Sequence, residues 1–249
     1  MAPDRLLVAL DVESLADAEG LLARLDGVVT GCKIGTQLFT AAGPAAVEMA
    51  RKRGFRVFLD LKFHDIPNTV AGATRETARL GVFMLDVHAS GGVAMMRAAA
   101  EAATRAAQDF AVPRPLVLGV TVLTSLDRTS LHREVGVPAS VEAHVLHLAA
   151  IAREAGLDGC VASAHEISPL RLAMGAGWII VTPGIRISSP EGGSRPPQDS
   201  AGSRADDQAR VATPRQARAA GADYIVVGRP ITAAADPAAA AAAILKELE

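Results

Sequence analysis

Short runs of β-branched and aliphatic residues alternate with longer stretches of helical spacing along the whole chain. This alternation predicts eight strands, each followed by a helix. The expected strands are Leu6–Leu10, Cys32–Ile34, Val57–Leu61, Met84–His88, Leu116–Val120, Gly159–Ala162, Trp178–Val181 and Tyr224–Val227. The expected helices are Ala16–Leu25, Ala45–Arg53, Val70–Leu80, Val93–Ala107, Val141–Glu154, Ile167–Met174, Pro214–Ala220 and Pro237–Leu248.

The number of repeats favours a closed (β/α)8 barrel, or TIM barrel, in the α/β class. An open, doubly wound sheet also alternates strands and helices, but eight repeats in 249 residues match the usual size of a barrel. The first expected strand is not followed by G-x-G-x-x-G, the fingerprint of dinucleotide-binding folds. No linker of domain-boundary length interrupts the pattern, so we expect one domain over residues 1–249.

The composition excludes several classes of protein. Half of the residues are hydrophobic and 21% are charged, which is typical of a globular chain and unlike a disordered one. A formal net charge of −2 argues against a broadly basic surface for nucleic acid. The longest apolar run, Ala238–Leu245, is too short to span a membrane. Because Met1 leads into no secretory leader pattern and two cysteines make no disulfide framework, we expect a cytoplasmic protein.

Two of the four lysines stand in an unusual place. Lys33 and Lys62 lie at or beside the ends of the second and third expected strands, among Val, Ile, Leu and Phe. A strand lysine is often an edge residue, or its stem extends so that the ammonium reaches water, but a closed barrel has no edge strand. Both lysines are therefore candidates for a functional site.

The segment from Asp60 to Asp65 strengthens this interpretation. Asp60 and Lys62 are two residues apart, hence on one side of the strand, and Asp65 follows in the next loop. If they face the barrel axis, we expect Asp60 to pair with both Lys33 and Lys62, because an isolated buried charge costs several kcal/mol. A purely structural ion-pair network also fits this pattern. The carboxyl ends of barrel strands, however, are where barrel enzymes hold their catalytic residues.

Glycine and arginine follow the seventh and eighth expected strands. The two loops read T-P-G-I-R over residues 182–186 and G-R-P over residues 228–230. Glycine lets backbone N–H groups approach an anion, and arginine adds a charge-assisted, bidentate contact. Since phosphate-binding barrels hold phosphate at these two loops, the pattern predicts a phosphate site.

Further polar residues stand at other strand ends. Asp11 follows the first expected strand, Asp86 and His88 close the fourth, and Thr124 follows the fifth. His88 taken alone is more typical of a hydrogen-bonded structural histidine than of a catalytic one. Thr124 fits either an ordinary turn or a hydroxyl that binds an amide-bearing ligand.

These motifs together resemble the orotidine 5′-phosphate decarboxylase family. The most specific likeness is D-L-K-F-H-D-I-P-N-T-V over residues 60–70. Its D-x-K-x-x-D core alone also occurs in sister decarboxylases and aldolases of sugar phosphates. Shorter matches run along the whole chain, among them C-K-I-G at 32–35, V-H-A-S-G-G at 87–92 and V-G-R-P-I at 227–231.

The resemblance implies decarboxylation of orotidine monophosphate to uridine monophosphate and carbon dioxide, without a metal or an organic cofactor. It also implies a homodimer whose active sites lie at the subunit interface. Lys62 would protonate C6 of the pyrimidine, and Lys33 and Asp60 would orient it and contact the ribose. Asp65 would reach into the partner subunit's site near the departing carboxylate, where Thr69 would contact the ligand.

The remaining ligand contacts follow from the same resemblance. Asp11 would bind a ribose hydroxyl, and Thr124 would read the base. The residues implied as phosphate ligands are Arg186, Gln208, Gly228 and Arg229. We expect no nucleic acid and no membrane among the partners.

The irregular stretch 187–207, rich in Ser, Gly and Pro, follows the seventh expected strand. An irregular loop of this length inside a compact domain is typical of a functional lid or of disorder, and its place on the face where barrels hold their active sites favours a lid. It is longer than the family's usual lid, and it contains a second glutamine, Gln198. We assign the phosphate contact to Gln208 because residues 207–214 resemble the family pattern.

Two other functions stay open at this point. One is a Mg²⁺-dependent keto-sugar-phosphate decarboxylase or aldolase of the same barrel superfamily. The other is a barrel that binds a phosphorylated ligand without catalysis. The set Lys33, Asp60, Lys62 and Asp65 argues against the second, because a binding protein has no need of two costly lysines opposite carboxylates.

Overall fold

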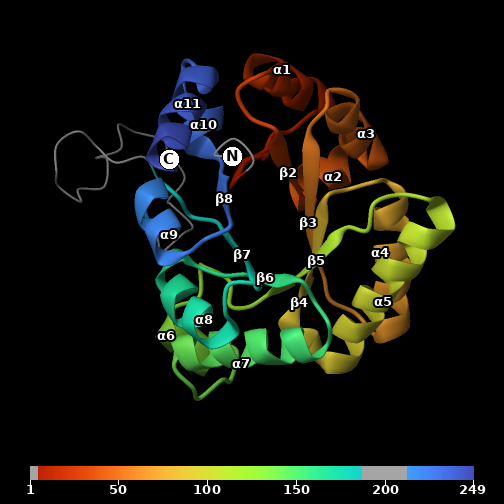
Figure 1. Cartoon of the computed structure of the whole chain (residues 1–249), viewed down its shortest axis with the longest axis vertical. Helices are drawn as coiled ribbons and strands as arrows, with labels where there is room; N and C mark the ends of the chain where they lie inside the picture. The colour runs from red at the N-terminus through yellow and green to blue at the C-terminus, as the bar shows by residue number, and fades with distance from the viewer. Residues whose placement is uncertain (1–4, 187–211) are drawn as a thin grey trace.

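The computed structural model describes residues 5–186 and 212–249. Over these ranges the chain forms a closed barrel of parallel strands in the order β1 to β8, with β1 hydrogen-bonded to β8 (Figure 1). The expected TIM barrel is therefore confirmed. The expected lid at 187–207, Gln198 and Gln208 lie outside the described residues.

All eight expected strands are present. They are β1 (Leu6–Ala9), β2 (Gly31–Gly35), β3 (Arg56–Phe63), β4 (Met84–His88), β5 (Leu116–Val120), β6 (Gly159–Val161), β7 (Ile179–Thr182) and β8 (Tyr224–Val227). Strand β3 runs two residues beyond its expected end and includes Lys62.

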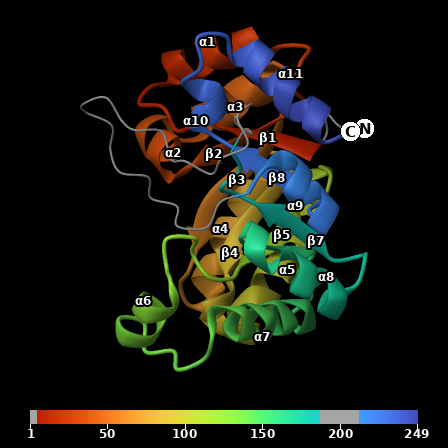
Figure 2. The ribbon, with the colours of Figure 1, turned by 90° about the vertical axis from the view of Figure 1, so that its left-hand side faces the viewer.

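Each expected helix is also present, with bounds that differ by a few residues at most. These helices are α1 (Leu15–Leu25), α3 (Pro44–Lys52), α4 (Pro67–Arg79), α5 (Gly92–Phe110), α7 (Val141–Glu154), α8 (Ile167–Met174), α9 (Pro214–Ala220) and α11 (Pro237–Glu247). Among the described residues the structure adds three short α-helices, α2 (Thr36–Ala42), α6 (Arg128–Arg133) and α10 (Arg229–Thr232), and two single 3-10 turns at Ala89–Gly91 and Ala164–Glu166. Each lies between a strand and its main helix, and Figure 2 shows α6 standing out from the body of the barrel.

Alternate strand residues face either the barrel interior or the surrounding ring of helices, which Figure 1 shows in a view down the barrel. The interior cluster includes Leu7, Phe58, Met84 and Leu118. The alternate strand residues, such as Leu6 and Val8, pack outward against the helices. The outer layer is rich in alanine, notably on α5, and such small side chains let helices approach the sheet closely. None of the described helices is long and apolar enough to cross a membrane.

The same alternation places charge above the apolar interior. Two residues beyond the interior residues Phe58 and Met84 come Asp60 and Asp86, nearer the carboxyl ends of β3 and β4. In the ladder between β2 and β3, Lys33 stands opposite Phe58. The interior is thus apolar at its middle and polar at the ends where the strands terminate.

At the amino ends of the strands, arginine–aspartate pairs join neighbouring segments. Arg114 Nη1 lies 2.9 Å from each carboxylate oxygen of Asp158, and Asp158 Oδ2 accepts the Val117 N–H at 2.7 Å. A second pair joins Arg171 to Asp223 at 2.7 Å, and Asp223 accepts the Ile180 N–H.

Arg171 also donates to three backbone oxygens. Its guanidinium reaches the carbonyls of Gly175, Trp178 and Gly221 at 2.9, 2.7 and 2.6 Å. Because the planar guanidinium has five N–H donors in a fixed fork, one side chain can tie several chain segments together.

Candidate active site

A cavity of about 610 Å³ opens at the carboxyl ends of the strands. It is lined by residues from both halves of the chain, and an apolar wall includes Phe58, Val120 and Val226. The site residues expected from the sequence that line it are Asp11, Lys33, Asp60, Lys62, Thr124, Arg186, Gly228 and Arg229. One cavity therefore collects the charged array and the two Gly-Arg loops.

The charged array is a continuous chain of ion pairs. Lys33 Nζ lies 3.0 Å from Asp11 Oδ1 and 3.3 Å from Asp60 Oδ2, and Lys62 Nζ contacts Asp60 Oδ1. The expected position of Asp60 between two lysines is thus present, and the pair between Lys33 and Asp11 extends it. Lys33 and Asp60 are each only 9% exposed, so each buried charge is compensated by its oppositely charged neighbours and not by water.

The array fixes the charge of its members. Burial alone raises the pKa of Asp60, but the charge of Lys33, a hydrogen bond with Asp86 and the charge of Lys62 outweigh it and lower that pKa to about 2. For Lys33, burial alone lowers the pKa, but the negative charges of Asp60 and Asp11 outweigh burial and raise that pKa above its ordinary value. At neutral pH Asp60 is therefore a carboxylate and Lys33 an ammonium.

Lys62 has an unusual backbone. Its φ is +51°, and the ladder between β3 and β4 shifts register between Leu59 and Phe63. Apart from glycines, only Ala111 shares a positive φ among the described residues. Such a conformation costs on the order of 1–3 kcal/mol and persists only where its surroundings hold it. The Lys62 N–H donates to Asp86 Oδ1 at 2.8 Å, which is one such restraint.

Sequence reasoning missed two residues that shape the array. Asp86 stands at the end of its strand, but its sequence position alone indicates no role for it. Gly35 leaves room for Lys33, since a Cβ at Gly35 would lie 2.8 Å from Lys33 Nζ. The spacing of alternate residues along β2 and β4 was the available signal, because it places Gly35 beside Lys33 and Asp86 above Met84.

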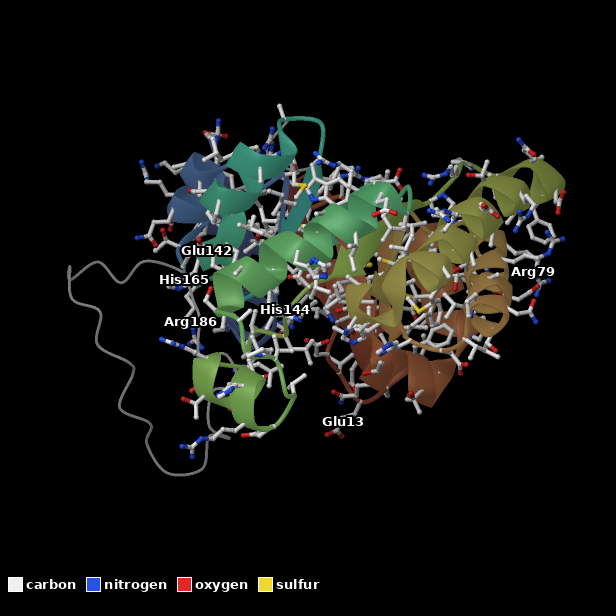
Figure 3. All side chains as sticks on the ribbon, turned by 90° about the horizontal axis from the view of Figure 1, so that it is seen from below. Glu13, Arg79, Glu142, His144, His165 and Arg186 are labelled. Atoms are coloured by element: carbon white, nitrogen blue, oxygen red, sulfur yellow. The ribbon has the colours of Figure 1, made fainter. Side chains whose placement is uncertain are left out.

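The two loops expected to bind phosphate line the same cavity. Gly184 has a φ of +77°, a backbone conformation that favours glycine. The Arg186 N–H donates to the Ala212 carbonyl at 2.9 Å, which ties the loop after β7 to the segment before α9. Figure 3 shows Arg186 on the same side of the molecule as His165, whereas Arg79 lies at the opposite side.

Two expected site residues, Asp65 and Thr69, do not line the cavity of their own chain. Both are exposed where β3 leads into α4, and Asp65 Oδ1 accepts the Ile66 N–H at 2.6 Å. Ile66 between them is 67% exposed, which is unusual for a large apolar side chain. In addition, no group of His, Cys, Asp and Glu within the described ranges is arranged to hold a metal ion.

Comparison with known proteins agrees with this geometry. A family model described as Orotidine 5′-phosphate decarboxylase / HUMPS family matches residues 4–244. The orotidine 5′-phosphate decarboxylase of Moorella thermoacetica is 54% identical over 248 residues, which cover 100% of this chain and 93% of that protein. The protein of the same name from Teredinibacter turnerae is 48% identical, covering 98% of this chain and 97% of its own.

A solved structure agrees as well. The crystal structure of orotidine 5′-phosphate decarboxylase from Lactobacillus acidophilus superposes with a TM-score of 0.82 at 35% sequence identity, covering 99% of this chain and 100% of that one. Fold, cavity and sequence thus agree over the full length of the barrel. The chain belongs to the orotidine 5′-phosphate decarboxylase / HUMPS family.

Proposed function

We propose that this chain is a carboxy-lyase that converts orotidine 5′-phosphate to uridine 5′-phosphate and carbon dioxide in pyrimidine biosynthesis. Relatives of that name match it at 48–54% identity over nearly their whole length. The observation that carries the proposal is the Lys33–Asp60–Lys62 array in a cavity that Arg229 also lines.

The array suits a reaction that leaves an electron pair on carbon. The bond between C6 and the carboxylate breaks, carbon dioxide leaves, and the electron pair stays on C6. Lys62 then gives a proton from its ammonium to C6. A fixed ammonium stabilises negative charge as it develops, so the reaction needs no metal or organic cofactor. Asp60 stays ionised beside Lys62 and holds it protonated and in place.

The other cavity residues bind the rest of the nucleotide. Asp11, held by Lys33, accepts a hydrogen bond from a ribose hydroxyl, and Thr124 binds the base. The phosphate lies between Arg186 and the Gly228-Arg229 loop, with Gln208 as a further ligand. Binding energy from this remote phosphate can be used to align C6 with Lys62.

We assign Asp65 and Thr69 to the active site of a partner subunit in a homodimer. Both are exposed and lie outside their own cavity, and exposed Ile66 between them is suited to burial against a second copy. In that site, Asp65 lies near the substrate carboxylate, and its negative charge favours departure of carbon dioxide. The enzyme would act in the cytoplasm.

A single assay tests the reaction. The protein is incubated with orotidine 5′-phosphate and EDTA, and the ultraviolet band of the pyrimidine is followed. Turnover that persists during chelation is expected. Activity only on a sugar phosphate with added Mg²⁺ would instead support the sister decarboxylases and aldolases, and binding of the nucleotide without turnover would support a non-catalytic barrel.

A mixing experiment tests the shared site. Asp65→Ala and Lys62→Ala are each expected to be inactive, but a hybrid dimer has one site with both wild-type residues. Mixing the two variants should therefore restore activity. If no activity returns although subunit exchange is demonstrated by a labelled subunit, Asp65 acts within its own chain.

A further inference from the structure

Asp86 is a buried carboxyl beside the active site that the mechanism above does not use. It is only 1% exposed and lies on β4, two residues beyond Met84 of the interior cluster. It does not line the cavity, so it does not touch a ligand there. Whatever it contributes must act through its neighbours.

The two oxygens of Asp86 have different surroundings. Oδ1 accepts the N–H of Lys62, the residue with the left-handed backbone. Oδ2 is buried, and no hydrogen-bond donor of the described residues reaches it. A buried, ionised carboxylate with an unsatisfied oxygen would be costly, whereas a protonated carboxyl could itself be the donor.

We propose that Asp86 is a positioning residue for Lys62, which holds the lysine's backbone through Oδ1 and, as a neutral carboxylic acid, donates a hydrogen bond to Asp60. This role rests on the proposed function, since Lys62 is there the proton donor. Asp86 thereby restrains both members of the Lys62–Asp60 ion pair, the lysine through its backbone and the aspartate through its carboxylate. It sets the direction of the ammonium without meeting the substrate.

Charge explains why the shared proton resides on Asp86. Asp60 contacts the ammonium groups of Lys33 and Lys62, whereas the hydrogen bond that Asp86 receives comes from a neutral backbone amide. The charged groups of β3 that act on Asp86 are Asp60 and Lys62, and the residue opposite it on β5 is the apolar Leu118. Burial first, and then the charge of Asp60, raise the pKa of Asp86 well above its ordinary value.

Two variants separate the parts of this role. Asp86→Asn keeps an acceptor for the Lys62 N–H and a donor for Asp60. Its kcat should stay within about threefold of wild type, with an unchanged pH profile. Asp86→Ala loses both contacts, and a misplaced Lys62 should lower kcat by about 100-fold while KM changes little.

The matched control is Asp158→Asn at the other end of the barrel. Asp158 also accepts a strand N–H, but its charge is paired with Arg114 and it is remote from the cavity. This variant should lower the melting temperature and leave kcat unchanged. Equal loss of kcat in Asp86→Asn and Asp86→Ala would overturn the proposal, as would full activity of Asp86→Ala.

A stability measurement decides the protonation state without any assay of activity. Since the pKa of Asp86 is raised by folding, wild type should lose stability relative to Asp86→Asn as the pH rises above about 4 toward the folded pKa. Melting curves from pH 4 to 9 measure this difference, and identical pH dependence of the two proteins would refute the neutral carboxyl. The result holds even if Asp86→Ala does not fold or wild type does not turn over the nucleotide, so failure of the proposed function is seen separately.

Discussion

The two ends of the barrel both carry buried or half-buried ion pairs, but they are built differently. At the amino ends, Arg114 and Arg171 face Asp158 and Asp223, and backbone groups complete the network. At the carboxyl ends, the cations of the ion pairs are lysines, Lys33 and Lys62, and the array borders an open cavity.

The difference in geometry suits similar charges to stability at one end and, as we propose, to chemistry at the other. The guanidinium fork of Arg171 ends on four oxygens, which leaves it little freedom. A lysine ammonium is a compact point charge that can give up a proton. At the lysine end two neighbouring carboxyls also have pKa values shifted in opposite directions, Asp60 downward and Asp86 upward, which is typical of catalytic sites.

The largest effect is expected from removing the ammonium at the cavity. Lys62→Ala should lower kcat by about 10²–10⁴-fold or more, since a positioned general acid alone contributes that much. The fold should persist because the Lys62 side chain is 33% exposed. Single-turnover kinetics measures the chemical step, with exposed Lys52→Ala as the control. A rate within tenfold of wild type would contradict the role of Lys62.

The opposite end should respond in stability alone. Arg171→Ala removes four hydrogen bonds and leaves Asp223 without its arginine, which should lower the free energy of unfolding by about 2–4 kcal/mol. Urea unfolding measures this loss, and kcat of the folded fraction should match wild type. Loss of kcat without loss of stability would contradict a purely structural role for the ion pairs at the amino ends of the strands.

The phosphate side of the cavity should show an effect that depends on the substrate. A hydrogen bond to a charged group contributes about 1.5–3 kcal/mol, so Arg229→Ala should lower kcat/KM for the nucleotide by roughly ten- to a hundredfold. The nucleoside orotidine, which lacks phosphate, should be affected far less. Exposed Arg218→Ala controls for loss of surface charge. Equal damage on both substrates would exclude Arg229 as a phosphate ligand.

The smallest effect concerns the space around the array. In Gly35→Ala the new methyl group would lie 2.8 Å from Lys33 Nζ, so the lysine must shift. We expect kcat/KM to fall by about three- to tenfold. Gly20→Ala is the matched control, because a Cβ on this helical glycine meets nothing within 4 Å and should stabilise α1 by about 0.5–1 kcal/mol. Unchanged kinetics in Gly35→Ala would show that Lys33 tolerates displacement.

The sequence predicted the barrel well because strand and main-helix patterns are long and periodic. Helices α2, α6 and α10 escaped prediction, since segments of four to seven residues show no helical periodicity. Asp60 between Lys33 and Lys62 was predictable from alternation and from the cost of buried charge.

Other parts of the site could not be derived in this way. The left-handed backbone of Lys62 arises from a register shift between β3 and β4, and no sequence rule announces a non-glycine residue at positive φ. The raised pKa of Asp86 depends on its burial in the folded barrel and on the charge of Asp60 on the neighbouring strand. The catalytic and binding roles of all the site residues, among them Asp65, Thr69 and Gln208, remain predictions.

The cavity divides its lining between the two halves of the chain. The ion pairs come from β2, β3 and the loop after β1, within residues 11–62, whereas the two loops that we propose bind phosphate follow β7 and β8, within residues 184–229. An ancestral chain that kept its second half would thus still bind phosphorylated ligands, while substitutions in its first half changed which bond is broken. Chemistry and ligand capture can then evolve on separate stretches of the chain, whose strands pair directly where β1 closes against β8.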